Sequence, residues 1–307
     1  MKKRFLLTLV TCLLIPCLSA VYADTVISSD NFNTDSSANY TLVRGGTDND
    51  AVWAFDYSAL SPAVPVAPRT TDGSTKGLAL WVNHAGPNRS VMNVFTNNTL
   101  SGDYRITVDV YGWYTGTSGT TNEAQWGINH SGTKNINVWQ IAGDPYVPDG
   151  QDGYYMTATI DGGFISSDYI FQAPAGTDFP GLTWGDATTN ASYKPVEDPL
   201  FATTIFPSTG GVFGMQWVTI KMEYKNKILS VWFNGNKVWD YDDPADIYTS
   251  GKFLMGMEDD YGGSINVNEY TIFDNLLVEA IVIPTPTPTP TPTSIPLSCD
   301  RSWGLYE

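Results

Sequence analysis

Alternating apolar and polar positions are clearest over residues 217–242, WVTIKMEYKNKILSVWFNGNKVWDYD. A period of two places one set of side chains on each face of a strand, so Val218 and Ile220 are expected on the same face. Asn234-Gly235 suits a two-residue hairpin turn, because both positions of such a turn need a positive φ angle. The stretch therefore predicts an antiparallel meander with turns at its two polar interruptions.

The same period recurs in shorter runs, and no window shows sustained apolar spacing of 3.6 residues. In residues 104–114, Ile106, Val108 and Val110 alternate with polar or aromatic positions, which predicts one core face and one solvent face. Many short strands within a unit of about 250 residues indicate an all-β, two-sheet antiparallel jelly-roll sandwich, with a closed barrel as the competing fold. The other expected strands are 40–44, 51–57, 77–83, 124–129, 137–141, 154–160, 253–257 and 266–279.

Residues 144–211 interrupt this regularity with a long stretch that is rich in loops. A loop-rich stretch of that length inside a compact domain is more often functional than accidental. We expect it either to form a wall of a ligand groove or to cover one face of the sandwich.

Both ends of the chain have compositions that do not fit a folded core. Residues 1–23 have the basic start, apolar run and small-residue cleavage site of a signal peptide, with cleavage expected after Ala23. Residues 284–296 are rich in Pro and Thr, which favours an extended linker, and residues 297–307 form a short tail. The expected organisation is a secreted or cell-surface protein whose sandwich spans residues 24–283.

The charge balance excludes one class of partner. Cleavage removes three of the 16 Lys and Arg residues and none of the 32 Asp and Glu residues, which leaves 13 bases against 32 acids and a net charge of −19. Nucleic acid is not an expected partner, because a phosphate backbone requires clustered basic side chains. No second apolar run is long enough to insert into a membrane. Only Cys299 remains after cleavage, so the core and not disulfides must hold the domain.

Three motifs resemble the concanavalin A-like superfamily, in its laminin G-like branch. They are WVTIKM with LSVWFNGNKV in residues 217–238, FDNLLVE in residues 273–279, and SDNF in residues 29–32. Shorter runs such as KGLAL and SGDYRITVDV resemble exported bacterial proteins with this sandwich. The resemblance implies that the first strand pairs beside the last. It specifies the fold but not the activity, because the superfamily includes lectins, glycosidases, lyases and adhesion modules.

Residues with catalytic potential are few. The Glu-x-Asp-x-Glu motif of the best-known glycosidase clan on this fold is absent, and Glu258-Asp259-Asp260 is interpreted as a loop and not as paired carboxylates. His84 and His130 have neither metal-ligand spacing nor a nucleophile motif, and we expect both at the surface. We assign no catalytic residue and keep a glycoside hydrolase or polysaccharide lyase as an alternative.

Carbohydrate binding has more support from the side-chain types. Aromatic rings bind the apolar faces of pyranoses, while Asn, Asp, Gln and Arg bind the hydroxyls. Such a set is expected on the non-core face of residues 104–114, joined by Trp139 from a neighbouring strand. The alternative role of each aromatic residue is packing in the core of the sandwich. The predicted carbohydrate-binding residues are Arg105, Asp109, Tyr111, Trp113 and Trp139.

A second aromatic group consists of Trp232, Trp239 and Tyr241, which share a face if the hairpin turn has two residues. These features predict a secreted, non-catalytic, lectin-like module for extracellular or cell-surface polysaccharide. A structural or adhesion module that binds protein is a further alternative. The oligomeric state is not indicated by the sequence.

Calcium is the cofactor that the resemblance implies, because laminin G-like sandwiches often bind it near the sheet edge. Ca²⁺ needs several oxygen ligands from carboxylates, amides and carbonyls. Asp30 and Asp274 are the candidate ligands, since the first and last strands are expected to bring their oxygens together. A calcium ion there is expected to be structural.

Overall fold

The computed structural model describes residues 24–85, 89–114, 122–136, 153–160, 169–172, 213–242, 248–259 and 269–282. Contacts divide the chain into two units, and one of them, Asp24–Ile281, contains the whole sandwich. Within the described ranges, no helix is long and apolar enough to cross a membrane. The expected strand at 137–141, with Trp139, and most of the stretch 144–211 lie outside the described residues.

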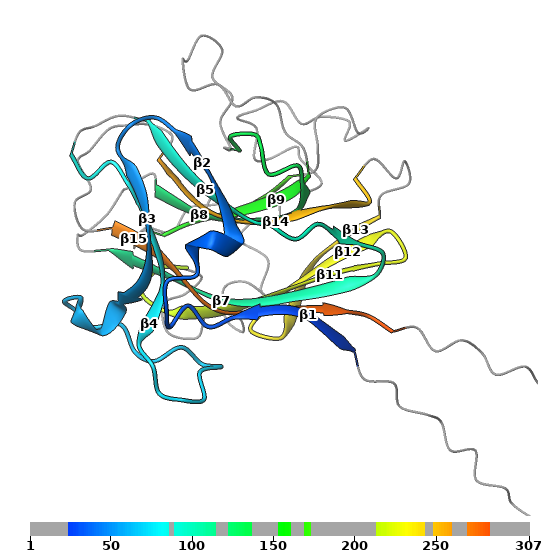
Figure 1. Ribbon diagram of the computed structural model, residues 1–307, viewed down its shortest axis with the longest axis horizontal. Coiled ribbons are helices and arrows are strands. Elements are labelled where there is room, and N and C mark those ends of the chain that lie inside the picture. Colours follow the sequence, from blue (N-terminus) through cyan, green and yellow to red (C-terminus); the bar gives the residue numbers. More distant parts are fainter. Residues whose placement is uncertain are drawn as a thin grey trace, which may run out of the picture. The chain divides into compact units, whose positions relative to one another are not determined.

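The first layer is an eight-stranded antiparallel sheet in the order β13-β12-β11-β7-β15-β4-β3, with β1 also paired to β15 (Figure 1). The expected pairing of the first strand beside the last is confirmed. The strands of this sheet are β1 (Thr25–Asp30), β3 (Asn49–Asp56), β4 (Lys76–Val82), β7 (Tyr104–Tyr114), β11 (Trp217–Lys225), β12 (Ile228–Phe233), β13 (Asn236–Asp242) and β15 (Glu269–Ala280).

The second layer is a seven-stranded sheet in the order β10-β9-β8-β14-β5-β2, with β6 paired to β14. The predicted all-β, two-sheet antiparallel sandwich is therefore confirmed. Two short 3-10 helices, η1 (Ser37–Asn39) and η2 (Tyr57–Ala59), lie in connections. The strands of the second sheet are β2 (Tyr40–Gly45), β5 (Ser90–Thr96), β6 (Leu100–Ser101), β8 (Asn122–His130), β9 (Tyr154–Thr159), β10 (Tyr169–Gln172) and β14 (Ser250–Asp259).

Strand β5 was not expected from the sequence. All seven of its residues are buried. A strand that is covered on both faces loses the alternation of apolar and polar residues on which the prediction depends.

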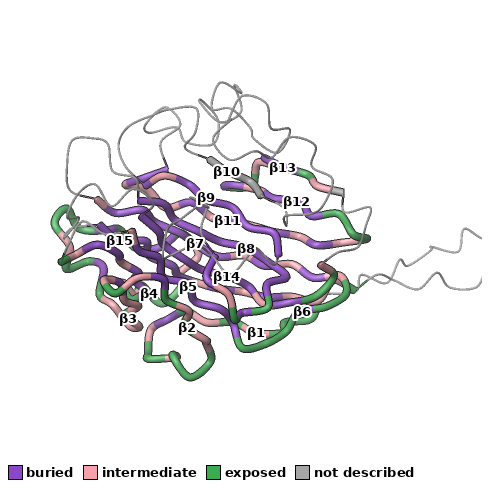
Figure 2. Tube along the Cα trace, turned by 90° about the horizontal axis from the view of Figure 1, so that it is seen from above, coloured by how far each residue is buried: buried purple, intermediate pink, exposed green. Residues whose placement is uncertain are grey.

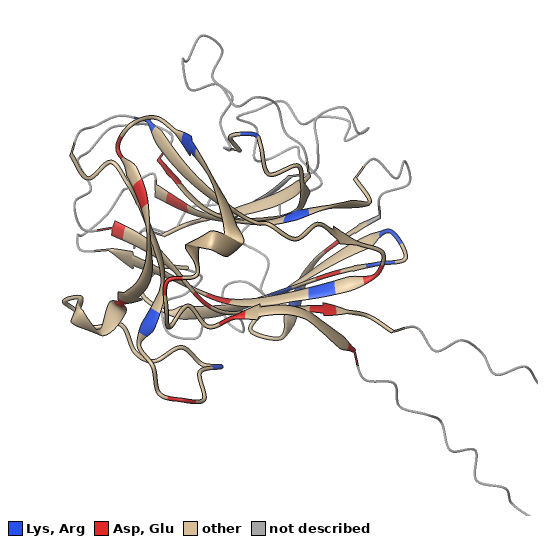
Figure 3. Ribbon diagram, viewed as in Figure 1, with Lys and Arg blue, Asp and Glu red and all other residues tan. Residues whose placement is uncertain are grey.

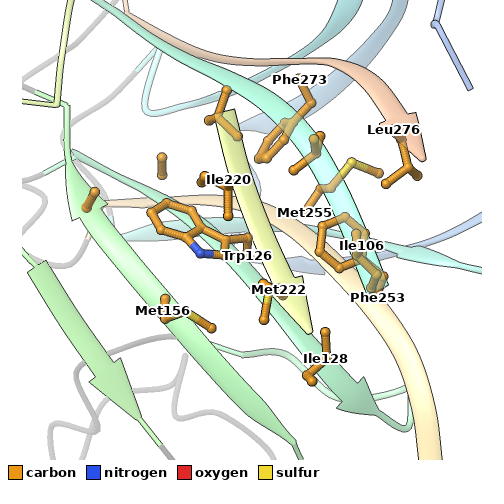
Figure 4. Close-up of a cluster of buried hydrophobic side chains, with 14 of the residues drawn as sticks. Ile106, Trp126, Ile128, Met156, Ile220, Met222, Phe253, Met255, Phe273 and Leu276 are labelled. Carbon is orange, nitrogen blue, oxygen red and sulfur yellow. The ribbon is translucent and has the colours of Figure 1, made fainter. Parts of the chain in front are cut away.

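The main core lies between the two sheets and is filled from both (Figure 4). Trp126 on β8 stacks on Phe213 with ring centroids 5.6 Å apart and meets Phe233 edge-on at 5.7 Å. Ile106 and Val108 point into this core, so the predicted core face of β7 is confirmed. Figure 2 shows buried residues along the strands and exposed residues in loops and at edges.

The meander β11-β12-β13 forms as predicted, but its last strand is shifted. Asn234 and Gly235 have φ angles of 48° and 83°, which confirms the two-residue turn. A bulge follows between Val231 and Trp232, so Trp239 pairs with Val231 and packs in the main core. The expected grouping of Trp232 with Trp239 on the outer face is therefore wrong, because one extra residue moves a side chain to the other face.

The turn provides a test of the hairpin. Gly235→Ala should lower the free energy of unfolding by about 1 kcal/mol, because a β-carbon disfavours the left-handed conformation. No atom lies within 4 Å of the added carbon, so the cost is conformational. Chemical denaturation measures it, with Asn236→Ala in the same hairpin as the control. An equal effect of both variants contradicts this account of the turn.

Candidate functional site

The predicted glycan-binding residues of β7 share the outer face of the eight-stranded sheet. Tyr111 and Trp113 belong to a small apolar cluster that is separate from the main core. Asp109 forms an ion pair with Arg69, and Arg105 lies on the same side because side chains alternate along the strand. The expected common face of Arg105, Asp109, Tyr111 and Trp113 is thus observed.

This face is not open where the aromatic residues lie. Residues 57–75, which we call the covering segment, pass over it below β3 and β4 in Figure 1. The Trp113 indole donates to the carbonyl of Pro62 at 2.9 Å, and Val64 belongs to the same apolar cluster as Tyr111 and Trp113. Tyr111 and Trp113 are each 3% exposed, and burial raises the pKa of Tyr111 to about 12. The expected solvent face is therefore wrong here, because the covering segment supplies apolar groups and carbonyls that complete it.

Arg105 lies on the open part of the face, but its charge is already balanced. Its guanidinium contacts Asp24 at 2.8 Å, Glu223 at 3.0 Å and Glu279 at 3.7 Å. Figure 3 shows this mixture of opposite charges along β7 and its neighbours. We therefore assign Arg105 to an ion-pair network that joins β7, β11 and β15.

Two carboxylates face each other at the centre of the sheet. Asp109 on β7 lies directly opposite Asp274 on β15, and they are 0% and 1% exposed. Asp109 accepts from Arg69 Nε at 3.1 Å and from the Thr219 hydroxyl at 2.7 Å. Its other oxygen accepts from the Arg69 backbone N–H at 3.3 Å and from the Asn275 amide at 3.0 Å. Asp109 is thus the carboxylate of this pair that has a cation as its direct partner.

Asp274 is surrounded by neutral donors. It accepts from the Tyr57 hydroxyl at 3.1 Å and from the Asn275 backbone N–H at 2.7 Å. Burial, with the nearby charge of Asp109 as a smaller cause, raises its pKa to about 7.

The expected calcium ligands do not come together. Asp30 lies opposite Leu276, whose side chain is in the main core, whereas Asp274 points to the outer face. The Asp30 oxygens accept from the Phe32 N–H at 2.8 Å and the Tyr40 hydroxyl at 2.9 Å. Among the described residues, no group of three or more His, Cys, Asp or Glu side chains is arranged to hold a metal ion. Asp30 and Asp274 therefore do not fit a shared calcium site, because they lie on opposite faces of the sheet.

An open pocket of ≈ 400 Å³ lies where β1 meets β15. It forms at a bulge, because the register of β15 shifts between Asp274 and Leu277 and Asn275 has a φ angle of 53°. The bulge places Asn275 beside the end of β1, where its side-chain amide donates to Thr70 and Asp109. The pocket is lined by Ser29, Asp30, Asn31, Arg69, Asn275, Leu276 and Leu277.

The second sheet carries another acidic pair. Glu258 on β14 lies directly opposite Glu123 on β8, and they are 0% and 7% exposed. Because Met257 points into the core, the alternation of β14 places Glu258 on the outer face. The interpretation of residues 258–260 as a loop is wrong for Glu258 and Asp259, which end β14, and Asp260 lies outside the described residues.

One of the two histidines departs from the expected surface position. His130 is 0% exposed, with Nε2 3.2 Å from the carbonyl of Tyr154, so the surface prediction for it is wrong. His84 is half-buried and stacks on Trp81 with ring centroids 4.2 Å apart. Both positions reflect close packing around each ring.

No protein-family model and no curated protein sequence matches this chain. Solved structures resemble it only distantly. A protein of unknown function with a galectin-like fold from Bacillus subtilis is 9% identical, with 84% of this chain and 98% of that chain covered and a TM-score of 0.46. The Emp46p carbohydrate recognition domain, in its metal-free form, is 7% identical, with 81% and 92% covered and a TM-score of 0.44. A structure described with endo-acting O-glycanases of the human gut microbiota is 12% identical, with 84% and 100% covered and a TM-score of 0.45.

Several residues of the site were not predicted. Arg69, Tyr57 and Asn275 organise the buried carboxylates. Tyr57 ends the expected strand 51–57 and Arg69 lies between two expected strands, where no motif indicates a site. Asn275 is part of the closing motif FDNLLVE, where a polar dipeptide between apolar residues was the available sign of a bulge.

The raised pKa of Asp274 makes a prediction about stability. The unfolded chain releases this proton near the ordinary value of 3.8 and the folded protein near about 7, so stability falls as pH rises between these values. Asp274→Asn cannot titrate. Between about pH 4 and pH 8, the free energy of unfolding of the unmodified protein should fall by about 4 kcal/mol relative to the variant. Denaturant titrations across that range measure it, and parallel pH profiles contradict it.

Proposed function

We propose that this protein is a secreted, non-catalytic, lectin-like module that binds carbohydrate. The observation that carries the proposal is the open polar pocket between β1 and β15. Its volume of ≈ 400 Å³ lies within the range of about 300–1,000 Å³ that is usual for small-molecule sites. A terminal sugar residue fits that size.

The side chains around the pocket suit hydroxyl groups. Asn31 is exposed and offers both an amide donor and an acceptor. The Arg69 side chain is 26% exposed at the rim. Its Nε and Nη2 donate within the protein, so Nη1 is the donor that remains for a ligand oxygen. Amide and guanidinium groups together match the vicinal hydroxyls of a sugar.

The charge of the protein favours neutral glycans. The full chain has a net charge of −16. A field of that sign repels polyanions at the low and physiological ionic strengths where screening is incomplete. We therefore place uncharged polysaccharides ahead of acidic ones as ligands.

We also propose that residues 1–23 direct export and that residues 284–296 act as an extended spacer beyond the sandwich. Assignment to the concanavalin A-like superfamily, in its laminin G-like branch, is part of the same proposal. Its support is the sequence motifs together with the pairing of the first strand beside the last.

A glycan array and affinity electrophoresis with the mature protein test the binding. The protein should be retained by at least one neutral glycan. Asn31→Ala should weaken that binding about threefold to tenfold, since a lost hydrogen bond costs about 0.5–1.5 kcal/mol. Asn98→Ala, another exposed asparagine, is the control. Parallel runs with calcium and with EDTA detect a metal requirement. Lack of retention by every glycan under both conditions contradicts the proposal.

A second candidate function, polysaccharide cleavage, is favoured by one observation. Glu123 and Glu258 are directly opposite on neighbouring strands, so their side chains are neighbours on one face of the sheet. Retaining glycosidases carry two carboxyl groups about 5–5.5 Å apart. Both side chains are buried, so the pocket remains the better-supported contact with a glycan.

Reducing-end release from the retained glycans separates the two functions. The binding proposal predicts no release by the unmodified protein. Release that Glu258→Gln and Glu123→Gln each lower by about 10²–10⁴-fold would establish the second candidate instead, because acid-base groups contribute factors of that size. A matched Glu223→Gln variant, from the ion-pair network of β11, should not affect any release.

A further inference from the structure

A row of four rings lies on the outer face of the eight-stranded sheet, outside the residues predicted to bind glycan. We call Trp81, His84, Tyr270 and Phe55 the aromatic ridge. Trp81 and His84 stack with centroids 4.2 Å apart and planes 5° apart. His84 meets Tyr270 edge-on at 5.2 Å, and Tyr270 stacks on Phe55 at 5.4 Å. The four rings thus form one continuous apolar strip.

The strands place this ridge at the margin of the covered face. Trp81 follows Leu80, which points into the main core, so the alternation of β4 turns Trp81 outwards. Tyr270 lies opposite Trp113 on β7 and packs against it at 5.6 Å. Trp113 is buried, whereas all four ridge residues are partly exposed. The partly exposed ring of Tyr270 is therefore held in place by the buried ring of Trp113.

Hydrogen-bonding groups flank one end of the ridge. Asp50 on β3 lies directly opposite Trp81, so both side chains are on the same face. Arg44 contacts Asp50 at 2.6 Å, and the two side chains are 40% and 45% exposed. An exposed carboxylate and guanidinium next to an indole ring provide the two kinds of contact that a sugar needs.

The rings of the ridge carry no charge near pH 7, although the charge of Asp48 acts on His84. His84 donates from Nε2 to the carbonyl of Glu269 at 3.2 Å, because a carbonyl can only accept. Burial is the largest cause that lowers the pKa of His84, which favours the uncharged ring. Arg44 balances the charge of Asp50. A neutral surface on a strongly acidic protein matches an uncharged polymer.

We propose that the aromatic ridge binds the flat faces of successive sugar rings in a neutral polysaccharide chain, with the Arg44–Asp50 pair bonding its hydroxyls. The inference rests on the proposed carbohydrate binding and specifies its ligand as an extended chain. The pocket between β1 and β15 contacts a sugar residue separately. Contact through rings depends on apolar and CH–π attraction, so salt should affect it little.

Depletion of the mature protein by insoluble neutral polysaccharides, such as cellulose, chitin and xylan, tests the ridge. Trp81→Leu keeps apolar bulk without the aromatic face, and Tyr270→Ala removes a second ring. Each should weaken retention about tenfold, and Tyr270→Phe should retain binding. Trp232→Ala, an outer-face tryptophan under Lys221, is the matched control and should bind normally. Retention should persist in about 1 M NaCl, where charge attraction is screened.

The outcomes distinguish the inference from the broader proposal. Retention that Trp81→Leu and Tyr270→Ala leave intact, or that salt abolishes, overturns the ridge while leaving carbohydrate binding in place. Retention by no polysaccharide overturns both. Thermal unfolding of each variant shows whether the fold is preserved. If Tyr270→Ala does not fold, Tyr270→Phe still tests the ridge. Loss of binding in a folded Tyr270→Phe variant contradicts stacking, because the aromatic ring is still present.

Discussion

The juxtaposition of Asp109 and Asp274 constrains the whole eight-stranded sheet. Two buried carboxylates in direct opposition are unfavourable unless a cation and hydrogen-bond donors compensate them. Arg69 supplies the cation and Tyr57 a donor, and both belong to the covering segment, residues 57–75. Electrostatics as well as packing therefore hold this segment over the sheet. The aromatic residues of β7 are buried as a consequence.

Because the covering segment lies over the centre of the outer face, the surfaces available for a ligand lie at the edges of that face. On one side, Arg69 and Asn275 belong both to the carboxylate network and to the rim of the pocket. On the other side, Tyr270 packs on Trp113 and carries the aromatic ridge. Both margins thus rest on the same buried framework. Ligand contacts that are built on such a framework lose little conformational entropy on binding.

Local pattern predicted the local structure well. The period of two located β7 and β11, and Asn234-Gly235 specified the hairpin turn. The strand register and the covering of the outer face by residues 57–75 depend on contacts between residues distant in sequence, such as the pair Arg69–Asp109. No local sequence pattern encodes such contacts. The bulge after Val231 shifted Trp239 into the core for the same reason. The sequence therefore predicted correctly which residues of β7 share the outer face. It did not predict that the covering segment buries Asp109, Tyr111 and Trp113.

A thermal-shift titration of the mature protein with soluble neutral oligosaccharides tests the central claim, carbohydrate binding, most directly. A ligand that binds only the folded state adds about 2.7 kcal/mol of stability at a hundred times its dissociation constant. The account predicts a saturable rise of the unfolding midpoint with at least one neutral oligosaccharide. An unchanged midpoint across a broad panel of neutral and acidic oligosaccharides, with calcium and with EDTA, would contradict it.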